Sequence, residues 1–283
     1  AGRFWQASTD EPASAHTTTQ RVSSFMAEGV AQRAPCTTPA AVIARDVPRR
    51  PAFGARRSML RGMRRPSSLR WLSLAAVAAR CAPATVTTAT ADFTRLDANA
   101  GLVRDALDAL GGGVDVALIA HGDLGDQLAS EQDFDAARAI LDTNLTSVVA
   151  LLVPLANAME AQRSGRLGVI TSVAAERGRP RNYTYGAAKA ALNTYLQGLR
   201  TRLYPAGVTV TTLKLGPVDT PMTEGHPKHP LFGKADAVAR DIVKAVDDGV
   251  AEAFVPWYWA GIMAVVRRTP ERLFQRVPFL SGR

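Results

Sequence analysis

The fold is decided by residues 166–216, RLGVITSVAAERGRPRNYTYGAAKAALNTYLQGLRTRLYPAGVTVTTLKLG. Two apolar segments, RLGVITSV (166–173) and VTVTTLKLG (208–216), have the composition of buried strands. Between them, TYGAAKAALNTYLQGLRTRL (184–203) has the apolar spacing of a helix. Buried strands that alternate with helices predict a parallel sheet with helices on both faces.

The same alternation continues on both sides of this stretch. Upstream, strands are expected at 86–93 and 114–122 and helices at 98–110 and 133–162; downstream, a helix is expected near 235–248 and a strand at 253–257, before a hydrophobic tail. From residue 86 onward the sequence therefore predicts an α/β domain, a Rossmann-like doubly wound parallel sheet in three αβα layers. Ligands of such sheets bind where the carboxyl ends of the strands meet.

The positive charge of the chain is confined to its first third. The 283 residues carry a formal net charge of +9, and 47% of them are hydrophobic, enough for a sizeable core. Residues 1–90 contain 13 Arg, no Lys and four acidic residues, whereas residues 91–283 contain 21 basic and 21 acidic residues. The excess charge therefore belongs to the N-terminal segment and does not describe the expected domain.

Residues 1–85 lack the periodicity of helices or strands. Ser, Thr, Pro and Arg are scattered without pattern, and the one convincing apolar stretch, residues 71–82, is too short to build a domain. We expect a disordered basic extension, with an organelle transit peptide as a less favoured alternative. Cysteine is rare (Cys36 and Cys81), and we find neither a secretory signal nor an apolar run of membrane-spanning length, which indicates a cytoplasmic protein.

Tyr185 and Lys189 are the strongest local signal for catalysis. Side chains four residues apart share one face of a helix, so the expected helix at 184–203 places a phenol beside an ammonium group. Tyrosine has an ordinary pKa of about 10, and a neighbouring cation favours the phenolate and lowers that pKa toward the operating range. Such a pair also arises by chance on a solvated helix face, so its context decides.

Two further polar residues supply that context. Ser172 ends the expected strand 13 residues before Tyr185, so the crossover to the helix can bring its hydroxyl to the phenol. Asn144 lies within the apolar stretch 139–156, where a satisfied buried amide is the ordinary alternative. Asn, Ser, Tyr and Lys in this order form a far more specific constellation than the Tyr–Lys pair alone.

The constellation resembles the short-chain dehydrogenase/reductase family over about residues 86–283. The family's Asn, Ser, Tyr and Lys match Asn144, Ser172, Tyr185 and Lys189. The resemblance implies a nicotinamide cofactor, NAD or NADP, held by residues at the strand ends and on the helix: Asp92, Phe93, Ala120, His121, Gly122, Tyr185, Lys189, Gly216, Val218 and Thr220. This chain departs from the family pattern in Ile119-Ala120-His121-Gly122, where Asn-Asn-Ala-Gly is common, and in Leu215, where Pro is usual.

The resemblance also implies a mechanism. A hydride passes between nicotinamide and a carbonyl or carbinol carbon, and Tyr185 gives or takes the proton. Ser172 orients the substrate oxygen, and Lys189 binds ribose hydroxyls while it lowers the tyrosine pKa. Asn144 holds a water that links Lys189 to solvent. Homo-oligomers are usual in the family, which implies the same here by analogy.

A closer resemblance is to reductases of polyprenyl-phosphoryl keto-pentoses in cell-wall arabinan synthesis. It is carried by ADFTRLDANAGL (91–102), DVALIAHGDLGDQ (115–127), KLGPVDTPMT (214–223) and the PWYW…RRTPERLF tail (256–274). The tail suits a lipid-linked substrate at a membrane surface, or else a buried segment or a subunit interface. Residues 224–232 resemble a substrate lid; His226 and His229 lack a third ligand, so no metal site is expected.

The glycine-rich turn that holds the cofactor pyrophosphate in this family is not recognisable. Residues 1–90 contain only four glycines, Gly2, Gly29, Gly54 and Gly62, and none has the family spacing after an apolar strand. We hypothesise that residues up to about 85 replace the N-terminal βαβ unit through a shifted reading frame; a natural fusion and an inactive relative are the alternatives. Without that unit, we expect poor solubility and little or no reductase activity.

Two other functions compete with the reductase. A non-catalytic protein could keep the Ser-Tyr-Lys site without binding cofactor, and a cofactor titration separates the two. A binding protein that acts through residues 1–90 is disfavoured because interleaved aromatics, zinc ligands and a helix-turn-helix pattern are missing there, so no nucleic-acid partner is expected. The substrate, the choice between NAD and NADP, and the oligomeric state are left open by the sequence.

Overall fold

The computed structural model describes residues 40–45, 85–223 and 228–277. Its centre is a parallel sheet of four strands, β3 (Val116–Ile119), β4 (Gly165–Ser172), β5 (Val208–Leu215) and β8 (Glu252–Val255), in the order β3-β4-β5-β8. The register pairs Ser172 with Leu215, so β4 and β5 end level with each other. The carboxyl ends of these strands therefore form one edge, as the sequence predicts.

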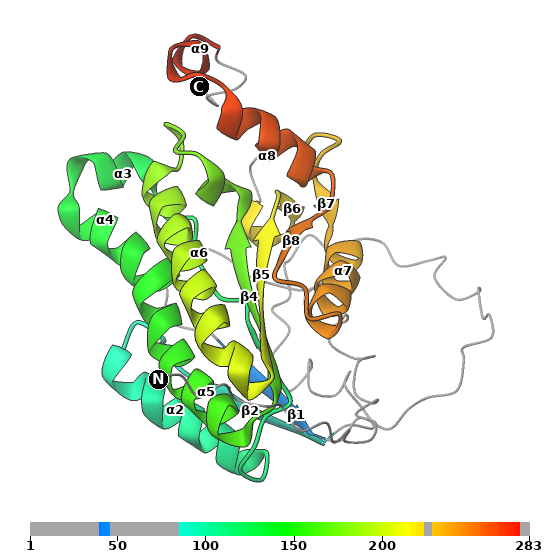
Figure 1. Ribbon diagram of the computed structural model, residues 1–283. Helices are drawn as coiled ribbons and strands as arrows, with labels where there is room; N and C mark the ends of the chain where they lie inside the picture. The colour runs from blue at the N-terminus through cyan, green and yellow to red at the C-terminus, as the bar shows by residue number, and fades with distance from the viewer. Residues whose placement is uncertain (1–39, 46–84, 224–227, 278–283) are drawn as a thin grey trace, which may run out of the picture.

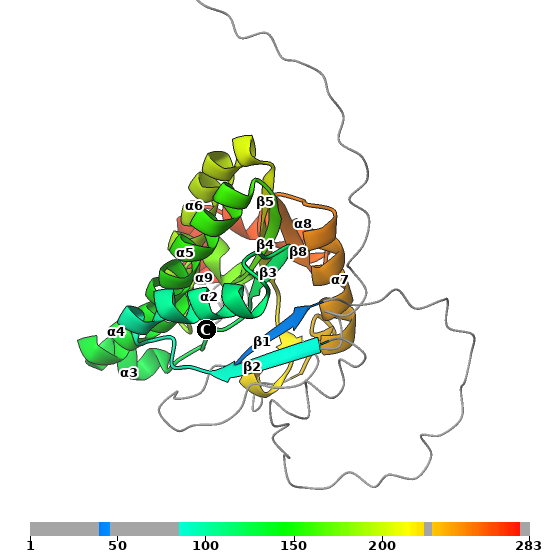
Figure 2. The ribbon, with the colours of Figure 1, turned by 90° about the horizontal axis from the view of Figure 1, so that it is seen from below.

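Helices cover both faces of this sheet. On one face lie α5 (Ser147–Gln162) and α6 (Tyr183–Leu203), with α2 (Leu96–Ala109) packed against α5; α7 (Ala235–Asp247) lies on the other face (Figures 1 and 2). The predicted Rossmann-like arrangement of three αβα layers is confirmed. The expected helices at 98–110, 184–203 and 235–248 each lie within a few residues of their observed bounds.

Two apolar clusters explain why the strands are hydrophobic on both faces. The larger one joins α5 and α6 to the sheet through fully buried side chains such as Leu152, Leu167 and Leu192. The smaller one packs Ile242 of α7 against Leu213 of β5. Each fully buried leucine or isoleucine stabilises the fold by about 1.5–3 kcal/mol, so both layers hold the sheet firmly.

The first strand of the predicted domain lies outside the parallel sheet. β2 (Thr85–Thr90) pairs in antiparallel register with β1 (Ala40–Arg45), and Ala40 faces Thr90. Figure 2 shows these two strands as a separate pair. β2 stays outside the parallel sheet because, among the described residues, no strand lies between β2 and β3 and hydrogen-bonds to both. Apart from β1, the expectations for residues 1–84 and for Cys36 and Cys81 fall outside the described residues.

The helix predicted over 133–162 is continuous and contains one π-helical turn. It consists of α4 (Phe134–Leu141), a π-helical turn η1 (Asp142–Thr146) and α5. By length and composition this helix could cross a membrane, a test that core helices of soluble proteins also pass. Because α5 packs against α2 and α6, this helix belongs to the core of the α/β domain.

The chain crosses above the strand ends before it terminates. After β5 come two short paired strands, β6 (Val218–Asp219) and β7 (Gly233–Lys234), and α8 (Trp259–Arg268) and α9 (Glu271–Arg276) lie beyond the sheet at this edge (Figure 1). The remaining elements are α3 (Gln127–Gln132), η2 (Val173–Glu176), η3 (Tyr204–Ala206) and η4 (Pro221–Thr223). Residues 224–227 of the expected lid, with His226, are outside the described residues.

The hydrophobic tail is divided between core and surface. Trp259, Met263 and Phe274 are buried in one cluster that also contains Val173. Trp257 is 79% exposed, and Val265 and Leu273 are exposed as well. The tail therefore closes the strand-end edge with one face, whereas its outer face mixes apolar side chains with charged ones such as Arg268 and Glu271.

Candidate active site

Ser172 and Tyr185 meet where β4 ends and α6 begins. The Ser172 hydroxyl accepts a hydrogen bond from the amide of Ala174 at 3.1 Å and lies near enough to the Tyr185 phenol to lower its pKa. Gly186 makes this contact possible, because a Cβ there would lie 2.9 Å from the carbonyl oxygen of Ala174. The missing side chain lets α6 approach η2 closely, and the predicted pairing of the two hydroxyls is present.

Lys189 lies one turn further along α6 and is almost completely buried. Its Nζ is 5.7 Å from the centre of the Tyr185 ring. Nζ donates one long hydrogen bond of 3.4 Å to the carbonyl of Ile170. An ammonium group has three donors, so Lys189 keeps most of its hydrogen-bonding capacity for other partners.

The pKa of the phenol shifts in the opposite direction from the one expected. Burial raises the pKa of Tyr185 to about 12, and the negative charge of Asp123 acts in the same direction, whereas the hydrogen bond from Ser172 lowers it. Burial also lowers the pKa of Lys189 to about 8. Both shifts have one cause: a charged group costs free energy when it loses water. The expectation that Lys189 lowers the phenol pKa in this chain is therefore wrong, because desolvation is the larger effect.

Asn144 lies at the centre of the π-helical turn and is fully buried. Its Nδ2 donates to the carbonyl oxygens of Asp123 (2.7 Å) and Ile140 (2.9 Å), and its Oδ1 accepts from the amide of Asp123 at 3.1 Å. Both amide donors are thus used inside the protein, and a water could only donate to Oδ1. The side chain fastens the loop after β3 to the long helix.

Gly122 brings the loop after β3 directly onto two of the predicted catalytic residues. A Cβ at this position would lie 2.8 Å from Oδ1 of Asn144 and 3.2 Å from Nζ of Lys189. Only glycine fits there without displacing one of them. Ala120, at the end of the same strand, is exposed. The structure thus brings Gly122, Asn144 and Lys189 together, as the resemblance implies.

His121 connects the parallel sheet to the end of β2. Its ring lies 4.6 Å from the ring of Phe93, and its Nε2 is 2.8 Å from the hydroxyl of Ser147. Because Ser147 donates its proton to the carbonyl of Thr143, we assign the proton of this contact to Nε2 of His121. Burial lowers the pKa of His121 to about 4, and the charge of Lys189 adds to the effect, so the ring is neutral near pH 7.

The other predicted cofactor residues lie at the same edge but make local contacts. Asp92 accepts hydrogen bonds from the amide and the hydroxyl of Thr94 at 3.0 and 2.6 Å. Gly216 follows β5 and lies against the indole of Trp259, whose Nε1 would be 2.1 Å from a Cβ at residue 216. Val218 belongs to β6, and the amide of Thr220 donates to Thr223. Within the described ranges, no hydrogen bond joins these residues to Tyr185.

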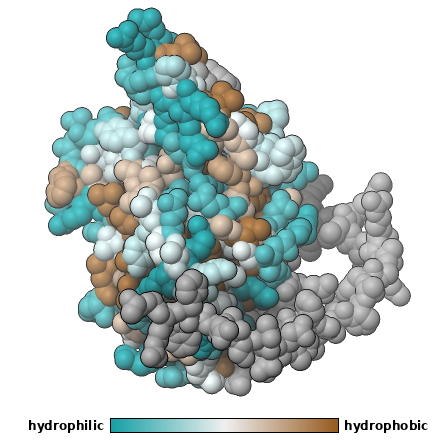
Figure 3. All heavy atoms as spheres, viewed as in Figure 1, coloured by the Kyte–Doolittle hydropathy of each residue, from teal (hydrophilic) through white to brown (hydrophobic). Residues whose placement is uncertain are grey.

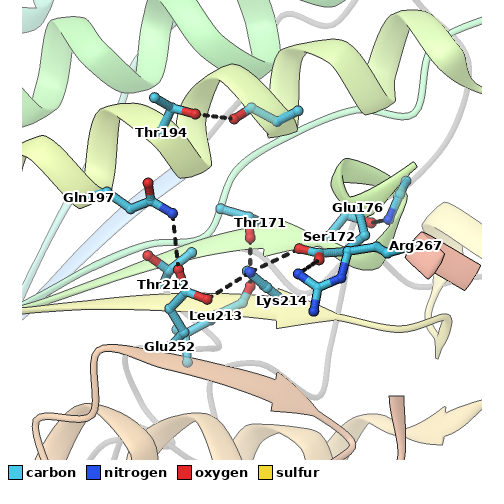
Figure 4. Close-up of polar contacts among 12 residues, drawn as sticks. Thr171, Ser172, Glu176, Thr194, Gln197, Thr212, Leu213, Lys214, Glu252 and Arg267 are labelled. Atoms are coloured by element: carbon cyan, nitrogen blue, oxygen red, sulfur yellow. Dashed lines mark hydrogen bonds and ion pairs between the residues drawn. The ribbon is translucent and has the colours of Figure 1, made fainter. Parts of the chain in front are cut away.

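A buried ion cluster beside Ser172 was not predicted. Lys214 of β5 is only 6% exposed, and its Nζ lies 2.9 Å from Oε1 of Glu176 and 2.8 Å from Oε2 of Glu252 (Figure 4). Arg267 of α8 lies 3.0 Å from the other oxygen of Glu176. Glu176 ends the turn that starts directly after Ser172, so the cluster ties this turn to α8. A lone lysine inside the apolar strand 208–216 was the sequence signal for it.

Gln127 is a second residue that the sequence does not single out. Its Oε1 accepts from the amide of Thr184 at 3.1 Å, at the start of α6. This bond satisfies an amide that has no partner within the helix, one residue before Tyr185. No pattern in the sequence distinguishes this glutamine from any other.

The donor set fits the nicotinamide-ribose side of a dinucleotide. Lys189 keeps free donors for sugar hydroxyls, and Tyr185 is its neighbour on the same helix face. A glycine-rich turn after a strand, which would hold a pyrophosphate, is not found in residues 85–223 or 228–277. The described part of the chain therefore supplies the groups next to the reacting atoms and not the phosphate cradle.

Comparisons with known proteins show which family this chain is similar to. A family model described as short chain dehydrogenase matches residues 69–230, including residues 69–85, which precede the described domain. An uncharacterized oxidoreductase of Mycobacterium tuberculosis is 36% identical over 167 residues, which cover 59% of this chain and 67% of that protein. An uncharacterized oxidoreductase of Streptomyces coelicolor is 34% identical over 236 residues, which cover 79% of this chain and 89% of that protein.

Solved structures show the same fold. A short chain dehydrogenase from Burkholderia cenocepacia, in complex with NADP, superimposes with a TM-score of 0.56 at 22% identity, covering 65% of this chain and 75% of that one. The family model spans more than half of the chain, and the relatives align over most of their own length. The chain therefore belongs to the short-chain dehydrogenase/reductase family, whose members are oxidoreductases that use NAD or NADP.

Proposed function

We propose that this protein transfers a hydride between a nicotinamide cofactor and a carbonyl or secondary alcohol, with Tyr185 as the general acid or base. The observation that carries the proposal is the placement of Ser172 beside the Tyr185 phenol, with Lys189 on the next turn of α6. When bound, NAD(P) supplies or accepts the hydride. The protein supplies the proton and holds the reacting oxygen.

The state of the phenol favours the reductive direction. With a pKa of about 12, Tyr185 is protonated at neutral pH and can donate its proton to a developing alkoxide. Ser172 already accepts from the amide of Ala174, so its own proton is directed outward, to the phenol or to a substrate oxygen. Lys189 offers its free donors to ribose hydroxyls. Asn144 binds the backbone of the loop after β3, which holds Gly122 close to Lys189.

The test uses the full chain with NADH and, separately, NADPH. Cofactor binding is measured by titration, and oxidation of the reduced cofactor is followed with keto sugars as substrates. We expect weak binding, because no glycine-rich turn is recognisable, together with slow turnover that requires the keto group. A folded protein that binds neither cofactor and shows no turnover would contradict the proposal and favour the non-catalytic alternative.

We further propose that the substrate is a lipid-linked keto sugar and that α8 and α9 contact a membrane surface. Support comes from the exposed side chains of Trp257, Val265 and Leu273, the last two of which line a groove together with the cation of Arg268. A groove of about 340 Å³ between the two helices is lined by Ala264, Val265, Arg268, Thr269, Pro270 and Leu273. Figure 3 shows hydrophobic and hydrophilic atoms side by side on this part of the molecule.

Sedimentation with lipid vesicles tests the membrane contact. We expect the protein to sediment with vesicles that contain anionic lipid, and the variant Trp257→Ser with Leu273→Ser to remain in solution. A variant of an exposed residue elsewhere, Tyr204→Ser, is the matched control and should sediment like the unmodified protein. Equal sedimentation of all three proteins would refute the assignment of this face.

A further inference from the structure

Arg179 lies in the segment that joins Ser172 to Tyr185, and no acidic side chain among the described residues pairs with it. This segment contains three arginines, Arg177, Arg179 and Arg181. Arg177 is fully engaged: it pairs with Glu271 at 2.6 Å and donates to the carbonyl of Val266 at 2.8 Å. Among the described residues, Arg179 forms no ion pair, and its NH2 group reaches only the thioether sulfur of Met263, at 3.7 Å.

The surroundings of Arg179 make this arrangement costly. Its Nε is buried and has no hydrogen-bond partner within the described structure. A guanidinium group has five donors in a planar fork, and a thioether is a weak acceptor. Burial of an unpaired charge disfavours folding, and burial accordingly lowers the pKa of Arg179. An apolar side chain of similar length would pack against Met263 without this cost.

The nearby carboxylates are already taken by other cations. Glu176 is held by Lys214 and Arg267, and Glu271 is held by Arg177. The protein therefore separates its acids from Arg179 although they lie on neighbouring elements. Neither carboxylate is therefore available to Arg179, whose guanidinium can take a partner from outside the described chain.

Arg179 lies among elements that form the strand-end edge of the site. Its side chain reaches Met263 on α8, one turn after Trp259, and Trp259 packs on Gly216 at the end of β5. Its backbone lies six residues before Tyr185, and its carbonyl caps the turn that leads into α6. Arg179 thus stands between the segment that carries both reacting hydroxyls and the helix that covers the end of β5.

We propose that Arg179 binds an oxyanion, a phosphate or carboxylate group, that the substrate carries beside its reacting carbonyl. The proposal rests on the proposed hydride transfer, since it places the substrate in that same site. The planar fork of arginine matches two oxygens of such a group, which gives orientation as well as affinity. The substrates of this enzyme are then anionic carbonyl compounds.

The experiment measures anion binding to the full chain by calorimetry, without cofactor or carbonyl substrate. The probes are inorganic phosphate and acetate, so that the preferred one distinguishes a phosphoryl group from a carboxylate. We expect saturable binding of one of them, a loss of about 10- to 100-fold in Arg179→Gln, and a smaller loss in Arg179→Lys, which keeps the charge but not the fork. Arg181→Gln, which changes the exposed neighbour, should bind like the unmodified protein.

Two results would overturn the proposal: equal binding by Arg179→Gln, or no saturable binding of either ion by the unmodified protein. If Arg179→Gln does not fold, the comparison of Arg179→Lys with Arg181→Gln decides, because only the first should weaken binding. The assay involves no hydride transfer. Failure here therefore leaves the proposed oxidoreductase chemistry intact, and failure of cofactor turnover leaves this binding result intact.

Discussion

The four-stranded parallel sheet and the two-stranded β1–β2 pair contribute very differently to the site. Ser172, Tyr185 and Lys189 all belong to β4 and α6, which pack on the parallel sheet. From the β1–β2 side come only Asp92 and Phe93, and only Phe93 touches the rest of the site, through the ring of His121. The groups that handle the proton therefore all lie on β4 and α6, whereas the cofactor-binding residues expected at Asp92 and Phe93 depend on the junction between the two sheets.

The largest expected effect tests whether the parallel sheet carries the chemistry. Tyr185→Phe removes the phenol hydroxyl and keeps the ring, and loss of a general acid typically slows turnover by about 10²- to 10⁴-fold. The measurement is the rate of NAD(P)H oxidation, with circular dichroism as the check on folding. Tyr183→Phe, on the exposed side of the same helix, should leave the rate unchanged. A Tyr185→Phe rate within about tenfold of the original would place the proton donor elsewhere.

The next effect tests whether the same sheet is also the centre of stability. Lys214→Met leaves the carboxylates of Glu176 and Glu252 without their shared cation, and breaking a buried pair costs about 3–5 kcal/mol. Urea unfolding measures the loss. Lys244→Met removes an exposed pair with Asp248 and should leave the free energy of unfolding nearly unchanged, because solvent screens that pair.

A double variant separates charge from packing in this cluster. Lys214→Met with Glu176→Gln removes the uncompensated charge and should recover part of the lost stability. If Lys214→Met is no more destabilising than Lys244→Met, the ion cluster does not hold the turn after Ser172 to the rest of the sheet.

The smallest expected effect concerns His121, whose ring contacts Phe93 where the parallel sheet meets the β1–β2 pair. Its folded pKa of about 4 lies below the ordinary 6.5, so the unfolded chain binds more protons between these values. Stability from the neutral ring is therefore complete above pH 6.5 and is lost as the pH falls toward 4, by up to about 3 kcal/mol. His121→Gln can still donate to Ser147 but does not titrate, so its stability should change less over this range.

Thermal unfolding between pH 4 and pH 7 measures this difference. His229→Gln is the matched control, because His229 is exposed and should leave the pH dependence of the unmodified protein unchanged. If His121→Gln loses as much stability on acidification as the control, the contact between His121 and Phe93 does not determine how the junction responds to pH.

The parallel sheet and the central site could be predicted because their signals are local. The apolar segments at 114–122, 166–173 and 208–216 are too short and too hydrophobic for surface elements, and the helical crossovers between them make the strands parallel, with their carboxyl ends at one edge. The Tyr185–Lys189 spacing and the position of Ser172 at a strand end then determine which side chains meet. These features depend on neighbours within about twenty residues.

The remainder depends on contacts between distant parts of the chain. The antiparallel partner of β2 is set by a strand 40 residues away in the sequence, which periodicity does not reveal. The direction of the Tyr185 pKa shift follows from how closely α6 packs on η2, which Gly186 permits. Lys214, Glu176, Glu252 and Arg267 span more than ninety residues and meet only in the folded protein.

The packing of Trp259 on Gly216 gives the protein an internal optical reporter. Its indole is 6% exposed and lies against the end of β5, whereas Trp257, two residues earlier, is 79% exposed. A dry indole emits at shorter wavelength than a wet one. With Trp5, Trp71 and Trp257 replaced by phenylalanine, the fluorescence of the remaining tryptophan would follow the end of β5, so that any molecule settling there could be detected without a label and before any reaction takes place.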